Sequence, residues 1–361
     1  MTARLAAVLA VALAALPGPA GAKDYLLAGA KPDKLVLIDT QARQVARVLT
    51  IPDAGRPGPL SITPSPDGKV AYVVVNRWES IAGVDLDTGK QVFRADLSTP
   101  TERVKAMFGM DVSPDGKELA VYLVPARLGA NEYTVLDPRI AVYRTADGVG
   151  AEPARTLPAA RRIMQLAWSK DGTKLYALGW DVQVLDPATG AVRQTFPVRH
   201  RTRDGLGEPD VLNVWPTWEQ SGILAAPYAV AKLDAEGKPA AALTGLLTID
   251  LASGDVAMSE FEENGPVVFA GVVSPVRRDE AFLVYTTLAK LDRRANEIVK
   301  RIDLDHTYYN VNVASDGREV YVGQTMSDIG VYSADGLKRL ARIPIPGGAD
   351  QALATMRMLR R

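Results

Sequence analysis

Two short turn motifs recur along the chain at a spacing of roughly 49 residues, which is (332 − 39)/6 between the first and last of seven equivalent positions. The first motif is similar to Ser-Pro-Asp-Gly and occurs at 65–68, 113–116, 169–172 and 315–317. The second reads Asp-x-x-Thr-Gly, with Ser replacing Thr in one copy, and occurs at 85–89, 186–190 and 250–254. Self-similarity at such a period indicates identical supersecondary units that bury their apolar faces against one another.

The content of each unit indicates short antiparallel strands. Seven residues mark the end of the third strand of successive units: Asp39, Asp85, Tyr143, Asp186, Asp250, Asp292 and Tyr332. The runs that lead into them, such as 182–185 and 329–332, are rich in β-branched residues and are bounded by turn residues. Gly closes most of these turns because the position requires a positive φ. Asn296 fits that requirement and Arg43 does not, so we expect the first turn to be degenerate. The sequence therefore predicts an all-β fold, a seven-bladed β-propeller with four antiparallel strands per blade.

The seventh blade is predicted to be shared by the two ends of the chain. Six complete units account for residues 60 to about 346, and the N-terminal runs 25–28, 35–39 and 44–51 supply three further strands. The apolar run 353–359 supplies the missing innermost strand, which closes the ring and removes free sheet edges. Two units have degenerate turns, at 219–222 and 275–279, which we expect to join strands 211–215 to 223–228 and 269–274 to 281–285.

Residues 1–22 have the pattern of a secretory signal peptide. Arg4 precedes an apolar run at 5–16, Pro17-Gly18-Pro19 ends it, and Ala20-Gly21-Ala22 is an A-x-A cleavage site. A buried N-terminal helix is the alternative. We expect cleavage before Lys23, a propeller domain at 23–361 and a periplasmic location.

Composition excludes several kinds of site. The 42 basic and 42 acidic residues offer no field for nucleic acid or an anionic membrane surface, and we expect neither partner. The chain has no Cys and two His, so disulfides, haem attachment, thiol catalysis and a histidine-rich metal site are excluded. The Gly-x-Ser-x-Gly motif of serine hydrolases is absent. Gly205-Leu206-Gly207 lacks the strand–turn–helix setting that a dinucleotide-binding motif needs. Asp303-x-Asp305-His306 is interpreted as a strand end rather than a metal site. We predict no catalytic residue, cofactor or metal in this chain, and we expect the five Trp to pack in the core or in loops.

Long connections predict the working face. In a four-stranded blade the loops between strands 2 and 3 and those between blades share one face, and four long connections, 98–109, 125–139, 197–210 and 229–244, all fall there. Loops presented by a rigid scaffold commonly carry function, and aromatic residues mixed with arginines are typical of protein interfaces. The candidate interface or cavity residues are Arg103, Lys105, Phe108, Arg127, Asn131, Tyr133, His200, Arg201, Arg203, Asp210, Tyr228, His306, Tyr308 and Tyr309.

Several segments resemble the β subunit of quinohemoprotein amine dehydrogenase, a seven-bladed, YVTN-like propeller. They are the stretch 23–39, Leu97–Pro100 with Glu102–Lys105, Pro209–Leu212 with Val214-Trp215, Thr244–Thr248, and His306-x-Tyr308-Tyr309 with Val311-x-Val313. The resemblance implies a periplasmic heterotrimer with a dihaem α subunit and a small γ subunit that bears cysteine tryptophylquinone. It also implies oxidative deamination of primary amines to aldehyde and ammonia, with the quinone, the catalytic base and the c-type haems on the partner chains. This chain is then expected to hold the quinone subunit and to help wall the substrate cavity.

Two other functions remain open from the sequence. One is a free-standing exported propeller that binds a protein or polymer. The other is a seven-bladed sugar-lactone hydrolase, which the signal peptide and the lack of clustered His and Glu disfavour.

Overall fold

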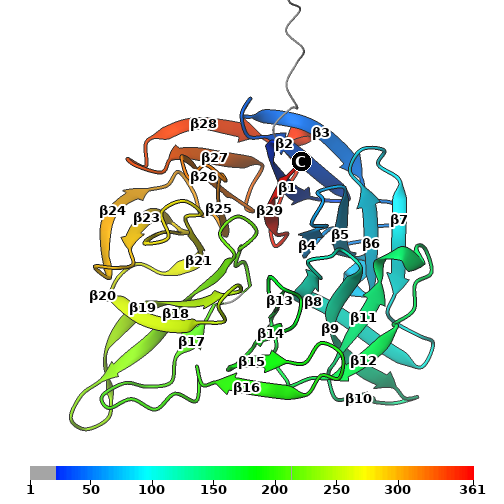
Figure 1. Cartoon of the computed structure of the whole chain (residues 1–361), viewed down its shortest axis with the longest axis horizontal. Coiled ribbons are helices and arrows are strands. Elements are labelled where there is room, and N and C mark those ends of the chain that lie inside the picture. Colours follow the sequence, from blue (N-terminus) through cyan, green and yellow to red (C-terminus); the bar gives the residue numbers. More distant parts are fainter. Residues whose placement is uncertain (1–21, 213) are drawn as a thin grey trace, which may run out of the picture.

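The computed structural model describes residues 22–212 and 214–361, and these form seven radially arranged antiparallel sheets (Figure 1). The predicted signal peptide lies almost wholly outside the described residues. The first strands of neighbouring sheets contact one another, for example β4 with β8, β8 with β13, and β25 with β29, so these strands surround the axis of the ring. The prediction of a seven-bladed β-propeller is confirmed.

Three sheets are built from the first half of the chain. One contains β4 (Ile62–Pro64), β5 (Val70–Val75), β6 (Ser80–Asp85) and β7 (Gln91–Asp96). The next contains β8 (Glu102–Val112), β9 (Glu118–Leu128), β11 (Arg139–Arg144) and β12 (Arg155–Pro158), with β10 (Tyr133–Val135) added beside β9. The third contains β13 (Gln165–Trp168), β14 (Leu175–Leu178), β15 (Val182–Leu185) and β16 (Val192–Phe196).

Three further sheets follow in the second half. The first contains β17 (Asp210–Val211), β18 (Ile223–Leu233), β19 (Pro239–Asp250) and β20 (Val256–Glu263). The second contains β21 (Val268–Val273), β22 (Glu280–Tyr285), β23 (Thr287–Asp292) and β24 (Glu297–Asp303). The third contains β25 (Asn310–Val313), β26 (Glu319–Gly323), β27 (Asp328–Ser333) and β28 (Arg339–Pro344). The helical elements among the described residues are three 3₁₀ turns, η1 (Asn76–Trp78), η2 (Thr145–Asp147) and η3 (Pro346–Gly348).

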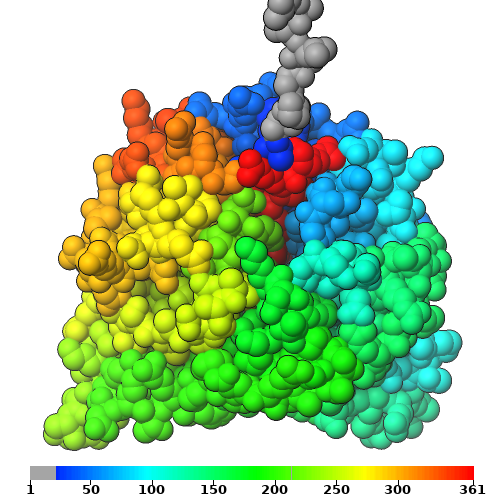
Figure 2. All heavy atoms as spheres, in the orientation of Figure 1, coloured from blue at the N-terminus to red at the C-terminus, as the bar shows by residue number. Residues whose placement is uncertain are grey.

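The last sheet joins the two ends of the chain as predicted. It has the order β29 (Met356–Arg360), β1 (Asp24–Ala30), β2 (Lys34–Asp39) and β3 (Gln44–Thr50). Leu359 pairs with Tyr25, and the Lys23 N–H donates to the Arg361 carbonyl at 2.7 Å. Figure 2 shows the C-terminal atoms directly beside the N-terminal strand. The ring is therefore closed by hydrogen bonds between residues more than 300 positions apart in the sequence.

Apolar clusters between neighbouring sheets form the core. In one of them Leu27 and Leu37 of the closing sheet pack against Ile62 and Val73 of the next sheet. Each sheet is thus buried on both faces, which accounts for the continuous β-branched runs of the inner strands.

The repeated Asp residues organise the outer turns. The Asp85 carboxylate accepts hydrogen bonds from the N–H groups of Asp87 and Thr88, and the same arrangement recurs at Asp186 and Asp250. The turn after Asp39 is not degenerate, contrary to expectation. Arg43 adopts a φ of 51° and the Ala42 N–H donates to Asp39, so the Asp side chain supports the same turn without Gly.

Three predicted segments differ from the sequence-based expectation. The connection expected at 229–244 is largely strand, because β18 and β19 extend into a long hairpin with a turn at Asp234–Lys238. Much of 98–109 is likewise strand, because β8 begins at Glu102. Of the residues that the structure describes in the strand expected at 211–215 (211, 212, 214 and 215), Val211 alone lies in a strand, β17. Pro216 lies shortly after the residue at which the chain leaves this sheet, and a Pro cannot donate a hydrogen bond to a neighbouring strand.

Candidate functional site: the loop face and the centre of the ring

The loop face is the end of the ring that carries the strand 2–3 loops and the connections between sheets, and the turn face is the opposite end. The two extended hairpins, β9–β10 and β18–β19, project from the loop face. The predicted interface residues come from elements at this end, but the structure divides them into exposed and buried groups.

Three of the predicted interface residues lie inside the protein. Phe108, Tyr228 and Tyr308 are 6%, 2% and 2% exposed. Phe108 packs edge-on against Trp215, with ring centroids 6.1 Å apart. These residues are corrected from surface candidates to packing residues beneath the loop face, because their rings fill the spaces between sheets.

Tyr228 and Arg203 hold a partly buried carboxylate, Glu260, between them. The Tyr228 hydroxyl donates to Glu260 at 2.5 Å, and the Arg203 guanidinium donates to both oxygens of the same carboxylate at 2.9 and 2.5 Å. Arg203 lowers the pKa of Glu260 although burial opposes it, and burial together with the Glu260 charge raises the pKa of Tyr228. Gly245 leaves room for the Tyr228 ring, since a Cβ there would lie 2.2 Å from it. The arrangement fixes the base of the β18–β19 hairpin.

His306 and Tyr308 belong to a second network of the same kind. Asp328 accepts from His306 Nε2, the Tyr308 hydroxyl and Arg342 Nε, each at 2.9 Å. Burial opposes ionisation of Asp328, but the hydrogen bonds from Arg342, Tyr308 and His306 lower its pKa overall. His306 is therefore held by a carboxylate, and Asp305 instead pairs with Arg339 at 2.5 Å. Groups of three or more His, Cys, Asp or Glu placed to hold a metal ion do not occur in residues 22–212 and 214–361.

Several other predicted interface residues are exposed or partly exposed. Tyr133 is 69% exposed on β10, and Arg127 is exposed on the adjoining strand β9. Arg103 and Lys105 of β8 lie 3.5 and 3.7 Å from Glu79, and the Lys105 ammonium lies 5.5 Å from the centre of the Trp78 ring. His200 is hydrogen-bonded to Asp181 at 2.6 Å, whereas Arg201 is partly exposed and Asp210 is exposed.

Cations and carboxylates are mixed on the loop-face segments. The cations there include Arg77, Arg103, Lys105, Arg127, Arg161, Arg162, Arg199 and Arg201, and the neighbouring carboxylates include Glu79, Glu102, Glu132, Asp137 and Glu208. Several of these charges pair with one another, for example Arg103 with Glu79 and Lys232 with Glu263.

An aromatic cluster at the centre of the loop face includes three residues, Trp215, Phe269 and Tyr285, that were not predicted as part of the site. Phe269 stacks on Tyr285 with centroids 3.8 Å apart, and Tyr309 lies 4.8 Å from Trp215. Phe269, Tyr285 and Tyr309 are partly exposed. The position of Tyr309 in the repeat is a sequence signal for this cluster. Tyr309 precedes the Asp of the first turn motif by seven residues, and so do Leu60, Phe108 and Met164 in other repeats (67 − 60, 115 − 108, 171 − 164 and 316 − 309). Leu60, Met164 and Tyr309 lie one or two residues before the innermost strands β4, β13 and β25, and Phe108 lies within β8.

Residues 214–222, called here the central segment, occupy the middle of the ring. After β17 the chain leaves its sheet and contacts other blades, between β25 and β29 in Figure 1. Asn310 donates to the Trp215 carbonyl and Thr217 donates to the Val311 carbonyl, both at 3.0 Å, and Gln165 donates to the Val214 carbonyl at 3.0 Å. The central segment therefore occupies the axis of the ring, where an open channel would otherwise run.

A buried ion pair links the central segment to the closing strand. Arg357 of β29 pairs with Glu219, and its guanidinium carbon lies 4.2 Å from the centre of the Trp218 ring. The side chains of Arg357 and Glu219 are 3% and 18% exposed. This pair joins the last strand of the chain to a segment 138 residues earlier.

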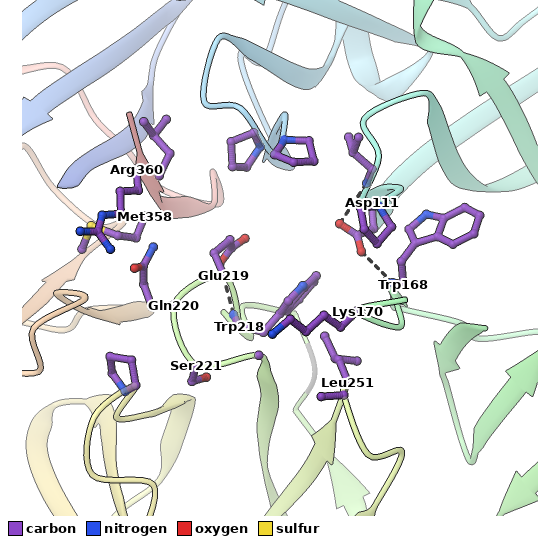
Figure 3. Close-up of a pocket in the computed structure, with 18 of the residues that line it drawn as sticks. Asp111, Trp168, Lys170, Trp218, Glu219, Gln220, Ser221, Leu251, Met358 and Arg360 are labelled. Carbon is purple, nitrogen blue, oxygen red and sulfur yellow. Dashed lines mark hydrogen bonds between the residues drawn. The ribbon is translucent and has the colours of Figure 1, made fainter. Parts of the chain in front are cut away.

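A cavity of about 660 Å³ lies between the central segment and the turn face (Figure 3). The lining residues include Trp218, Glu219, Gln220 and Ser221 of the central segment, together with Asp111, Lys170 and Arg360. Asp111 is buried, and its carboxylate accepts from the N–H groups of Val112 and Trp168 at 3.0 and 2.8 Å. Burial raises the pKa of Asp111 to about 7. The turn face was expected to lack functional features, and this cavity is the largest departure from that expectation.

Asp111 makes stability depend on pH in a defined direction. Because the pKa of Asp111 is about 7 in the folded protein and near 3.8 when unfolded, folding takes up a proton between these values. Stability from this group is therefore complete below about pH 4 and falls as the pH rises to 7. In urea denaturation, we expect wild type to lose about 1–3 kcal/mol more than Asp111→Asn between pH 5 and pH 8. Equal losses of unfolding free energy in the two proteins would contradict the raised pKa of Asp111. Replacing an acceptor oxygen by an amide has a cost that does not depend on pH, so comparing the change with pH in each protein removes that cost.

None of the helical elements among the described residues has the length and hydropathy needed to cross a membrane.

The class of molecule that this structure defines is a closed seven-bladed β-propeller with a filled centre and an elaborated loop face. The sequence matches no protein-family model, and it matches no curated protein. Solved structures similar to it include hydrazine synthase of Kuenenia stuttgartiensis, with 16% identity and a TM-score of 0.59 over 84% of this chain and 90% of that one. A functionally unknown protein from Desulfotomaculum acetoxidans has 11% identity and a TM-score of 0.58, over 93% and 99% of the two chains. Dihydro-heme d1 dehydrogenase NirN has 15% identity and a TM-score of 0.54, over 92% and 74%. Likeness at these identities establishes the propeller fold.

Proposed function

We propose that this chain is the propeller subunit of a periplasmic amine dehydrogenase, in which it holds a small quinone-bearing subunit and helps to wall the substrate cavity. The observation that carries the proposal is the loop face, where a rigid scaffold presents aromatic side chains and arginines around a filled centre. Such a surface suits a stable protein interface. The sequence resemblance to the β subunit of quinohemoprotein amine dehydrogenase supplies the activity.

The names of two similar structures are compatible with this proposal. One is a dehydrogenase named for a haem, and the other is a synthase of a nitrogen compound. In the proposed complex a primary amine and water would give an aldehyde, ammonia, two protons and two electrons. The quinone and the haems on the partner chains would supply the redox chemistry. The residues of this chain would bind the partners and exclude water, since the two carboxylate networks at Glu260 and Asp328 hold the loop-face side chains in place.

Purification from the native source tests the proposal directly. We expect the chain to elute with a haem-bearing subunit and a small subunit carrying a crosslinked quinone, and we expect the complex to reduce a dye in an amine-dependent manner. Isolation of a colourless monomer would instead favour a free-standing binding propeller.

Charge reversal on the loop face should weaken assembly. Arg127→Glu and Arg103→Glu each replace a loop-face cation with a carboxylate, and we expect the affinity for the partner subunits to fall by about tenfold or more, as measured by analytical ultracentrifugation. Asp67→Asn and Thr88→Ala on the turn face are the controls, and they should alter thermal stability at most, because both residues support turns there. Equal losses of affinity at the two faces would contradict the assignment of the loop face.

A further inference from the structure

The exposed indole of Trp180 is the centre of a small patch on the loop face, here called the Trp180 patch. Trp180 lies in the loop between β14 and β15 and is 43% exposed. The guanidinium carbons of Arg162 and Arg199 lie 5.1 and 5.8 Å from the centre of the indole, and the His200 ring meets it edge-on at 6.1 Å. A large aromatic ring flanked by arginines has the composition of an interface hot spot.

The patch is held rigidly by its own backbone. The Arg199 N–H donates to the Trp180 carbonyl at 2.8 Å, and Asp181 accepts from the Val198 N–H at 2.8 Å and from His200 at 2.6 Å. Arg162 adopts a left-handed φ of 65°, and its carbonyl packs so close to Gly179 that a Cβ there would lie 2.8 Å away. The indole is therefore presented in a fixed position, so little conformational entropy is lost on contact with a partner.

Part of the positive charge around the indole has no partner within the chain. Arg199 pairs with Glu208 at 2.9 Å, and Arg161 pairs with Asp137 at 3.1 Å. Arg162, whose guanidinium lies over the indole, forms no ion pair among residues 22–212 and 214–361. This guanidinium can pair with a carboxylate of another molecule, whereas the carboxylates beside Arg161 and Arg199 disfavour the continuous negative charge of a nucleic acid.

We propose that the Trp180 patch docks a protein subunit that presents carboxylate side chains around an apolar recess. The recess receives the indole, and the carboxylates of the partner pair with Arg162. The inference deepens the proposed function and rests on it only for the identity of the partner.

Photocrosslinking in the cells that make the protein tests this inference. The full chain carries p-benzoylphenylalanine in place of Trp180, and a matched control carries it in place of Val192, which is also exposed but lies on the outer strand of the same sheet. We expect a crosslinked product at position 180 and none at 192, with the partner peptide identified by mass spectrometry as rich in Asp and Glu. Arg162→Glu should lower the yield at least about tenfold, whereas Arg193→Glu, at the turn-face end of the same sheet, should not.

The outcomes separate the inference from the proposed function. A product with a haem- or quinone-bearing chain that is lost in Arg162→Glu supports both. A product with another acidic protein that shows the same dependence supports the Trp180 patch and contradicts the amine dehydrogenase assignment. Co-purification of the haem chain without a product at position 180 overturns the inference alone. Equal yields at both positions, insensitivity to Arg162→Glu, or a product with a second copy of this chain also overturns it.

Discussion

A protein truncated after Ala352 is expected to be unfolded at room temperature. The deletion removes β29, the innermost strand of the closing sheet, whose Met356, Met358 and Leu359 side chains are at most 4% exposed. Burial of each such side chain contributes about 1.5–3 kcal/mol, and the lost strand pairing also exposes the edge of β1. The sum is comparable with the whole stability of a typical domain, about 5–15 kcal/mol. Circular dichroism and size-exclusion chromatography would measure the loss.

The control for truncation is a circular permutant, which keeps the residues of β29 but has its chain ends at another position. A circular permutant that joins Arg361 to Lys23 by a short linker retains β29 in its sheet, because these ends already share hydrogen bonds. We expect it to fold, and its melting should be cooperative. A truncated protein that melted like wild type would show that β29 is not needed for closure.

The second large effect is expected at the buried ion pair. Glu219→Ala leaves the Arg357 guanidinium buried without its carboxylate, and removal of one partner from such a pair typically costs about 3–5 kcal/mol. Urea denaturation should show the midpoint lowered by a corresponding amount. The aromatic contact with Trp218 would remain, but it does not compensate for the lost charge.

A double variant separates the charge effect from the loss of packing. Arg357→Met with Glu219→Ala removes both charges and restores apolar volume beside Trp218, so we expect it to be at least about 2 kcal/mol more stable than Glu219→Ala alone. If the double variant were less stable than the single one, the pair would be important for reasons other than its buried charge.

The fold was predictable because the information is local and repeated. The Asp of each outer turn satisfies backbone N–H groups within three residues, so its spacing reports the strands directly. Arg43 was misjudged because a side chain without glycine's freedom can adopt a positive φ when an Asp carboxylate supports the turn. The extended hairpin β18–β19 was interpreted as a loop because its alanine-rich sequence lacks the β-branched residues typical of strands.

The site was less predictable because it depends on contacts between distant blades. Nothing near Glu219 in the sequence indicates that it faces Arg357, and the displacement of the central segment follows from packing at the axis. Loop parity placed Tyr228 and Tyr308 at the correct end of the ring, but it could not distinguish a buried aromatic from an exposed one. Trp180 was likewise assigned to packing, because an isolated Trp carries no sequence signal of exposure.

The position of Lys23 and Arg361 has a practical consequence for experiments. Both residues lie in the closing sheet at the turn-face end, hydrogen-bonded to one another. A biotin or affinity tag attached after Arg361 would therefore tether the ring by its plain end. On a sensor chip, every molecule would present the same face to the solution, with the Trp180 patch and the aromatic cluster pointing away from the support. The orientation of the ring on the support is thus determined by the position of Lys23 and Arg361 in the closing sheet.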